Sequence, residues 1–129
     1  MSGKYLLDTN IVIALFANEP AVTALLKDAE EIFVSSIVMG ELYYGARKSN
    51  RVQENIARLD EFAANNVVLS CDHETARQYG QLKDKLRRKG RPIPENDIWV
   101  AATTLQYNLT LITRDAHFSE VESLKIEMW

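Results

Sequence analysis

The sequence predicts an α/β domain in which a central parallel sheet of four to five short strands is flanked by helices. The chain has 129 residues, the usual size of one domain, so we treat residues 1–129 as a single unit. Hydrophobic residues make up 47% and charged residues 26%, as in an ordinary folded protein. Short apolar runs alternate with longer helical segments, which is typical of parallel strands joined by crossover helices.

Five short apolar runs have the length and composition of buried strands. The first ends at a carboxylate, Asp8, and the second is closed by Ser35 and Ser36. Right-handed crossovers would bring the carboxyl ends of these strands to one edge of the sheet, where α/β proteins place their sites. The predicted strands are residues 4–8, 32–34, 67–69, 110–112 and 124–127.

Six segments between these runs are predicted helices, and most have a recognisable start or stop signal. Thr9 and Asn10 are candidate caps for the first helix, and Pro20 separates it from the second. Asp72 is the candidate cap of the long polar helix, which Gly90 ends. The predicted helices are residues 11–17, 21–29, 37–48, 52–64, 73–89 and 96–107.

Composition and charge exclude several classes of protein. A single cysteine, Cys71, excludes an internal disulfide framework and a cysteine-rich zinc site, and it suits the reducing cytoplasm, where we expect the protein. Residues 1–8 do not have the pattern of a secretory signal. The longest uncharged stretch, residues 98–113, is too short and too polar for a membrane span, so we expect no membrane contact. The net charge of −3 disfavours nucleic-acid binding, because proteins that bind nucleic acids usually have an excess of basic residues.

Three aspartates lie at predicted element ends. Asp8 closes the first strand, Asp115 follows the fourth strand, and Asp97 lies at the start of the last helix. Each has a structural alternative: Asp8 as a helix cap, Asp115 as a turn residue and Asp97 as a charge that the helix dipole favours. Convergence at one edge of the sheet would instead make them a cluster of mutually repelling carboxylates.

A fourth carboxylate, Glu41, lies inside an apolar helical segment. It shares a helix face with Ile37 and Tyr44, where a carboxylate is costly unless a cation or hydrogen-bond donors meet it. The alternative is that Glu41 points to solvent. A hard divalent cation such as Mg²⁺ or Mn²⁺ would relieve the repulsion within such a cluster and would activate water.

The residues around these carboxylates resemble the blocks of PIN-domain ribonucleases, and most closely the VapC-type toxins of bacterial and archaeal toxin–antitoxin modules. The four blocks occur in the family's order and extend from residue 8 to residue 115. They are Asp-Thr-Asn at 8–10, Glu-Leu-Tyr-Tyr-Gly-Ala at 41–46, Glu-Asn-Asp-Ile-Trp-Val-Ala-Ala at 95–102 and Leu-Ile-Thr-Arg-Asp at 111–115.

The resemblance implies a PIN-like domain with an acidic metal site and Mg²⁺- or Mn²⁺-dependent cleavage of single-stranded or looped RNA. The expected products have 5′-phosphate and 3′-hydroxyl ends. Asp8, Asp97 and Asp115 would hold metal, directly or through water, and Glu41 would complete the catalytic set. Asn10 and Thr113 match supporting polar positions, although a helix cap and a strand-end residue are equally plausible roles for these two.

The resemblance also implies partners. Toxins of this family usually form homodimers, and their antitoxins cover an apolar groove and often place a basic side chain in the acidic site. Two alternatives stay open: a non-catalytic RNA-binding PIN module, and a phosphorylation-dependent receiver-like domain with Asp72 as its third-strand carboxylate.

Positive charge is concentrated in residues 83–91. This segment has six of the fifteen basic residues, which leaves the rest of the chain with nine basic and seventeen acidic residues, a net charge of −8. It could bind RNA phosphates or form a solvated helix end. Arg114 could touch RNA or neutralise the acidic site. His117, two residues past Asp115, could lie near that site, but we expect an ordinary loop histidine. The candidate RNA contacts are Lys85, Arg87, Arg88, Lys89, Arg91 and Arg114.

Overall fold

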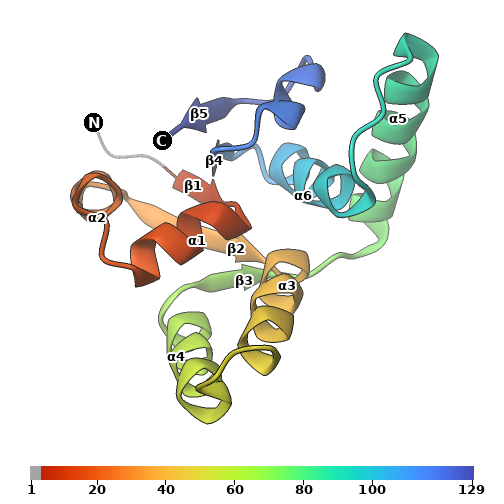
Figure 1. The fold of residues 1–129 in the computed structure, drawn as a ribbon. Coiled ribbons are helices and arrows are strands. Elements are labelled where there is room, and N and C mark those ends of the chain that lie inside the picture. Colours follow the sequence, from red (N-terminus) through yellow and green to blue (C-terminus); the bar gives the residue numbers. More distant parts are fainter. Residues whose placement is uncertain (1–3) are drawn as a thin grey trace.

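The computed structural model describes residues 4–129 as a five-stranded, wholly parallel sheet flanked by helices (Figure 1). The strand order is β3-β2-β1-β4-β5, so β1 is central. This confirms the predicted α/β class; the expected absence of a secretory signal in residues 1–8 falls partly outside the described residues. The strands are β1 (Lys4–Leu7), β2 (Glu31–Ser35), β3 (Val67–Leu69), β4 (Thr110–Thr113) and β5 (Ile126–Met128).

The helices agree with the predicted segments to within a few residues at each end. Two details differ, because β5 begins two residues later than predicted and a short 3₁₀ helix follows β4. The helices are α1 (Thr9–Phe16), α2 (Pro20–Lys27), α3 (Ser36–Arg47), α4 (Val52–Asn65), α5 (His73–Lys89), α6 (Glu95–Gln106) and the 3₁₀ helix η1 (Ala116–Glu120).

The N-cap of α1 is Asp8, which confirms the alternative role predicted for this residue, whereas the prediction of Thr9 and Asn10 as caps was wrong. Asp8 has extended backbone angles, and its side chain accepts a hydrogen bond from the Thr9 N–H at 2.9 Å. Its carbonyl also accepts from the N–H groups of Ile11 and Val12. The helix therefore begins immediately after β1, and the carboxylate that ends the strand also caps the helix.

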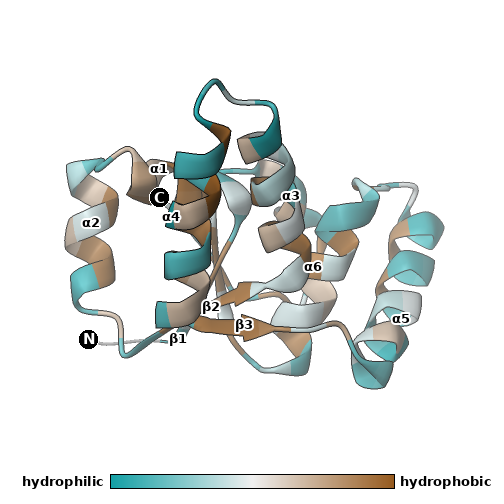
Figure 2. Cartoon of the chain, turned by 90° about the horizontal axis from the view of Figure 1, so that it is seen from below, coloured by the Kyte–Doolittle hydropathy of each residue, from teal (hydrophilic) through white to brown (hydrophobic). Residues whose placement is uncertain are grey.

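The sheet is buried on both faces. Leu6 and Leu7 of β1 are fully buried although neighbouring residues of a strand point to opposite faces, and the same holds for Leu111 and Ile112 of β4. The helices pack mainly in neighbouring pairs, α3 with α4 and α5 with α6, and α2 and α5 lie on opposite sides of the molecule (Figures 1 and 2). Figure 2 shows hydrophobic strands inside and hydrophilic residues on the outer helices.

The pairing of β1 with β4 positions the edge that carries the aspartates. Leu7 lies opposite Ile112, and the N–H of Asp8 donates to the carbonyl of Ile112 at 3.0 Å. The next residue of β4 is Thr113. Asp8 and Thr113 are thereby brought side by side at the carboxyl end of the sheet.

Within residues 4–129, no single helix is long and apolar enough to cross a membrane. Among the described residues, only the consecutive helices α1 and α2, taken together, have the length and apolar composition of a membrane span. They are bent by 104° relative to each other.

The end of α5 offers a test of the fold. Gly90 caps this helix with a left-handed φ of 69°, which an L side chain adopts at a cost of about 1–2 kcal/mol. Gly90→Ala is expected to lower the melting temperature by about 3–6 °C in a thermal melt. Gly80→Ala, inside the same helix and with open space around it, is expected to raise it by roughly 2–3 °C. Equal shifts for the two variants would contradict this assignment.

Candidate metal centre

Asp8 is the buried carboxylate of the site, with only 4% of its surface exposed. One oxygen accepts from the Thr9 N–H, and the other accepts from the Thr113 hydroxyl at 2.7 Å and lies 3.4 Å from Asn10 Nδ2. Burial raises the pKa of Asp8, the hydrogen bond from Thr113 opposes that rise, and the negative charge of Glu41 adds to it. The residue is therefore held in place by donors while its ionised form is disfavoured by its surroundings.

Thr113 and Asn10 connect the two strand ends. The fully buried Thr113 hydroxyl donates to Asp8 and accepts from the N–H of Asp115 at 3.0 Å. Asn10 Oδ1 accepts from the N–H of Arg114 at 3.2 Å. Both side chains thus hold the segment after β4 against the end of β1. The alternative of Asn10 as a cap is wrong, because it lies inside α1, whereas Thr113 is also a strand-end residue.

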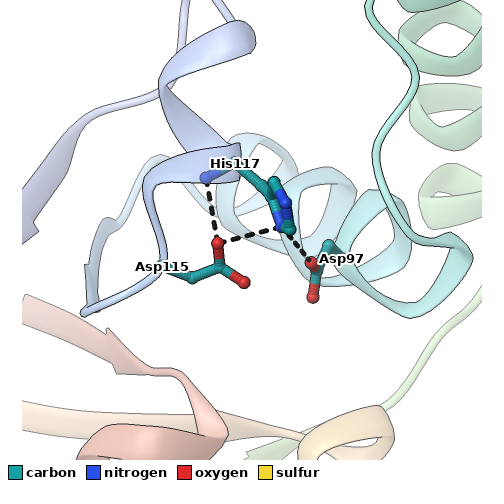
Figure 3. Close-up of side chains that lie close together, drawn as sticks. All are labelled: Asp97, Asp115 and His117. Atoms are coloured by element: carbon teal, nitrogen blue, oxygen red, sulfur yellow. Dashed lines mark hydrogen bonds and ion pairs between the residues drawn. The ribbon is translucent and has the colours of Figure 1, made fainter.

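Asp97, Asp115 and His117 form a compact group (Figure 3). Asp97 comes from the first turn of α6, and the other two come from the segment after β4. His117 Nδ1 lies 2.9 Å from Asp115 Oδ1 and 3.9 Å from Asp97 Oδ2, and the His117 N–H donates to Asp115. One possible ligand atom from each residue lies within 4.8 Å of the others.

The structure places His117 beside Asp115, which is the alternative to the ordinary loop histidine that the sequence favoured. It lies in η1, which begins after Asp115 and uses that aspartate as its N-cap. The only sequence signal was the two-residue spacing from Asp115. That spacing brings the ring to the carboxylate only when the backbone turns tightly.

The contacts bring the predicted carboxylates close together, since Asp97 lies beside Asp115 and Thr113 bridges Asp115 to Asp8. Burial, followed by the negative charges of Asp8, Asp115 and Glu41, raises the pKa of Asp97 to about 6, and His117 opposes the rise. Four chain segments that are distant in sequence thus contribute to one acidic centre.

Glu41 lies at the edge of this centre, but not on a buried apolar face. It is exposed, and so is Tyr44 of the same helix face, at 65%. The expected cost of burying Glu41 is therefore absent. Its oxygens meet the Thr9 hydroxyl at 2.8 Å and Asn96 Nδ2 at 3.5 Å, so contacts from α1 and α6 hold it beside the other acids.

The donor set suits a hard divalent cation. Three aspartates and a glutamate supply oxygen atoms, which Mg²⁺ and Mn²⁺ prefer over nitrogen or sulfur. A cation would offset the mutual repulsion that raises the pKa of Asp97. Asp97, Asp115 and Asp8 are the residues that could hold it, with Glu41 beside them.

Arg114 does not neutralise the acidic centre, which was one of its two predicted roles. Its guanidinium pairs with Glu19, with Nη2 2.7 Å from Oε1 and Nη1 3.3 Å from Oε2. This bidentate pair directs the side chain to the segment between α1 and α2.

A PIN domain family model matches residues 5–124. The match covers nearly the whole described fold, including all four carboxylates. The chain therefore belongs to the PIN-domain family.

The similarity to individual members extends over the full chain. A protein named Ribonuclease VapC2 from Haemophilus influenzae is 36% identical over 129 residues, which cover 98% of each chain. The tRNA(fMet)-specific endonuclease VapC from Shigella flexneri is 33% identical, with 98% of each chain covered. The crystal structure of VapBC2 from Rickettsia felis, bound to a DNA fragment from its promoter, superposes with a TM-score of 0.88 at 32% identity and covers 98% of each chain. Within the family, these similarities are to VapC-type ribonucleases.

The pKa of Asp97 predicts how stability varies with pH in EDTA. Because the pKa is near 6 in the folded chain and lower in the unfolded chain, ionisation of Asp97 destabilises the fold increasingly between about pH 4 and pH 7. Asp97→Asn should stabilise the metal-free protein at pH 7 by roughly 1–2 kcal/mol, because the variant has no carboxyl group to ionise and because solvent screens part of the effect in the wild type. Chemical denaturation at both pH values measures the difference.

Adding Mg²⁺ provides the control for this prediction. The cation should stabilise the wild-type protein more than Asp97→Asn at pH 7, because only the wild type retains the carboxylate. A stability difference between the two proteins in EDTA that is the same at pH 4 and pH 7 would contradict the assignment of the shifted pKa to Asp97.

Proposed function

We propose that the chain is a divalent-metal-dependent endoribonuclease that acts as the toxin of a toxin–antitoxin pair. The observation that carries the proposal is the placement of Asp8, Glu41, Asp97 and Asp115 by contacts among β1, α1, α3, α6 and the segment after β4. The names of the relatives support the same activity, since they are ribonucleases and a tRNA-specific endonuclease. The proposed substrate is single-stranded or looped RNA, and a tRNA is the first candidate to test.

The proposed roles follow from the contacts of each carboxylate. Asp8, Asp97 and Asp115 would hold Mg²⁺ or Mn²⁺, which when bound supplies an activated water and offsets charge on the phosphodiester. Thr113 keeps an oxygen of Asp8 in a fixed direction through its hydrogen bond. Glu41 is exposed and held by Thr9 and Asn96, so its carboxylate is placed to orient a water molecule and accept its proton.

The structure argues against the receiver-like alternative. Receiver domains have the strand order 2-1-3-4-5, whereas this sheet has the order 3-2-1-4-5. Asp72, the carboxylate that this alternative required, caps α5 and accepts hydrogen bonds from Thr75 and Gln106. The non-catalytic PIN alternative is distinguished from the proposed enzyme by turnover.

An apolar groove supports the antitoxin part of the proposal. It lies between α1, α3 and α4, has a volume of about 340 Å³ and is lined by Ile13, Phe16, Leu42 and Leu59 among others. Glu41 also lines it, so the groove adjoins the acidic centre. The solved relative from Rickettsia felis is a VapBC assembly, and we propose that an antitoxin segment covers this groove.

We further propose a homodimer in the cytoplasm. The homodimer follows from the resemblance to VapC-type toxins. The exposed, unpaired thiol of Cys71 suits a reducing compartment.

Cleavage of RNA tests the enzymatic proposal. Purified protein with Mg²⁺ or Mn²⁺ should cut total tRNA into discrete fragments with 5′-phosphate ends, and EDTA should stop the reaction. Asp97→Asn should lower the cleavage rate at least about 100-fold, because one charged ligand is lost from the centre. Gel analysis of end-labelled RNA measures the rate.

The matched control for this test is Asp28→Asn, which removes an exposed carboxylate at the end of α2. This variant should cut at the wild-type rate. RNA binding by the wild type without metal-dependent cleavage of any RNA would instead favour the non-catalytic PIN module.

Binding of the antitoxin tests the groove. Ile13 is 56% exposed, so Ile13→Glu should leave the melting temperature within about 2 °C of the wild type while weakening binding of the co-expressed antitoxin at least about 10-fold. Met128→Glu, at an equally exposed site on β5, is the control and should bind normally. Equal binding by Ile13→Glu and the wild type would rule out this groove.

A further inference from the structure

The basic segment at residues 83–91 is mostly neutralised by neighbouring acids. Four of its six basic residues have a carboxylate within 4.0 Å. The pairs are Lys83 with Glu95, Arg87 and Arg88 with Asp84, and Lys89 with Glu120 and Glu122. Across residues 4–129, Lys85 and Arg91 are the members of the segment that have no such pair. The large positive charge seen in the sequence is therefore reduced to two free cations.

Arg91 differs from Lys85 in its position relative to the metal centre. A surface hollow of about 520 Å³ is lined by Arg91, Pro92, His117 and Glu120 among others. His117 also contacts Asp115 of the acidic group. Arg91 therefore shares a hollow with a residue of the metal centre, whereas Lys85 lines a separate hollow between α5 and the segment after η1.

The backbone at Arg91 is fixed in one conformation. Gly90 ends α5 in the left-handed region, and the N–H of Arg91 donates to the carbonyl of Leu86 at 3.0 Å. Pro92 follows, and Ile93 is buried in the core. The backbone hydrogen bond and the buried neighbour thus anchor Arg91 at the end of α5.

The charges around the hollow leave Arg91 available to an anion. Glu120, the acid that lines the same hollow, is contacted by Lys89, whose Nζ lies 3.6 Å from Oε1 and donates to the Glu120 carbonyl at 2.6 Å. The guanidinium of Arg91 has no carboxylate partner among the described residues. An arginine of this kind matches a phosphate group, which it can bind through two parallel hydrogen bonds.

We propose that Arg91 binds a backbone phosphate of the RNA strand that flanks the cleaved bond. The hollow would carry the strand away from the acidic centre past His117, and Arg91 would hold the first phosphate beyond it. This inference rests on the proposed ribonuclease function and adds a substrate-positioning residue to it.

Binding of a labelled RNA in EDTA tests the proposal without turnover. The probe is a fluorescein-labelled, single-stranded 12-nucleotide RNA of mixed sequence, and fluorescence anisotropy gives its affinity over a range of salt concentrations. Arg91→Ala should weaken binding about 5-fold. It should also reduce the slope of log K against log salt by about 0.7, the loss expected for one phosphate contact with a single strand.

Three further variants separate a specific contact from a general charge effect. Arg91→Lys should recover part of the affinity and the full salt slope. Lys85→Ala should lose less affinity than Arg91→Ala, and Lys27→Ala, on the opposite side of the molecule in α2, should bind as the wild type does (Figure 1). In cleavage assays, Arg91→Ala should raise KM about 5-fold with kcat within 2-fold of the wild type.

Equal losses of affinity for Arg91→Ala and Lys27→Ala would overturn the proposal, since charge alone would then explain binding. An unchanged salt slope in Arg91→Ala would overturn it as well. Neither result affects the proposed ribonuclease function, which fails only if metal-dependent cleavage is absent or survives Asp97→Asn.

Discussion

Repulsion among carboxylates held at short range is the constraint on which this site depends. Ionising Asp97 is disfavoured by burial and by Asp8, Asp115 and Glu41, as its raised pKa shows. The acids stay together because the pairing of β1 with β4 aligns the strand ends and because the Thr113 hydroxyl bridges Asp8 to the Asp115 backbone. The fold therefore holds an unfavourable interaction that a hard cation, if bound there, would relieve.

Most of the fold was predictable because strands and helices had local signals. Apolar runs marked the strands, and Asp72 and Gly90 marked the start and end of α5. The errors occurred where two elements meet directly. Asp8 ends β1 and caps α1 with no residue between them, so capping preferences alone wrongly selected Thr9. The 3₁₀ helix after β4 was missed because a five-residue turn has no hydrophobic period of its own.

Some residues of the site could be predicted from local sequence patterns, and others could not. Asp8 and Asp115 followed from strand ends and a parallel sheet. Asp97 was a candidate from its helix start and Glu41 from its apolar helical segment, but spacing alone could not prove that the four converge, and the family resemblance strengthened that prediction. Helical spacing gave Glu41 an apolar face that the structure shows to be exposed, because the tertiary fold leaves that side of α3 open. The contact of His117 with Asp115 had only the two-residue spacing as a sequence signal, and the pairing of Arg114 with Glu19 had none, since both depend on how loops pack.

The mean charge of the chain is a poor guide to how it meets RNA. The acidic centre disfavours the approach of a polyanion, a bound cation would reduce that repulsion, and most of the basic segment is already paired with acids. Among the described residues of the basic segment, Arg91 is the one that has no carboxylate partner and shares a hollow with His117. Its backbone N–H donates to the carbonyl of Leu86 at the end of α5. On this reasoning the net charge of −3 and a nucleic-acid substrate are compatible, because a metal at the centre and the proposed phosphate contact of Arg91 would each supply local positive charge, while distant acids are screened by salt.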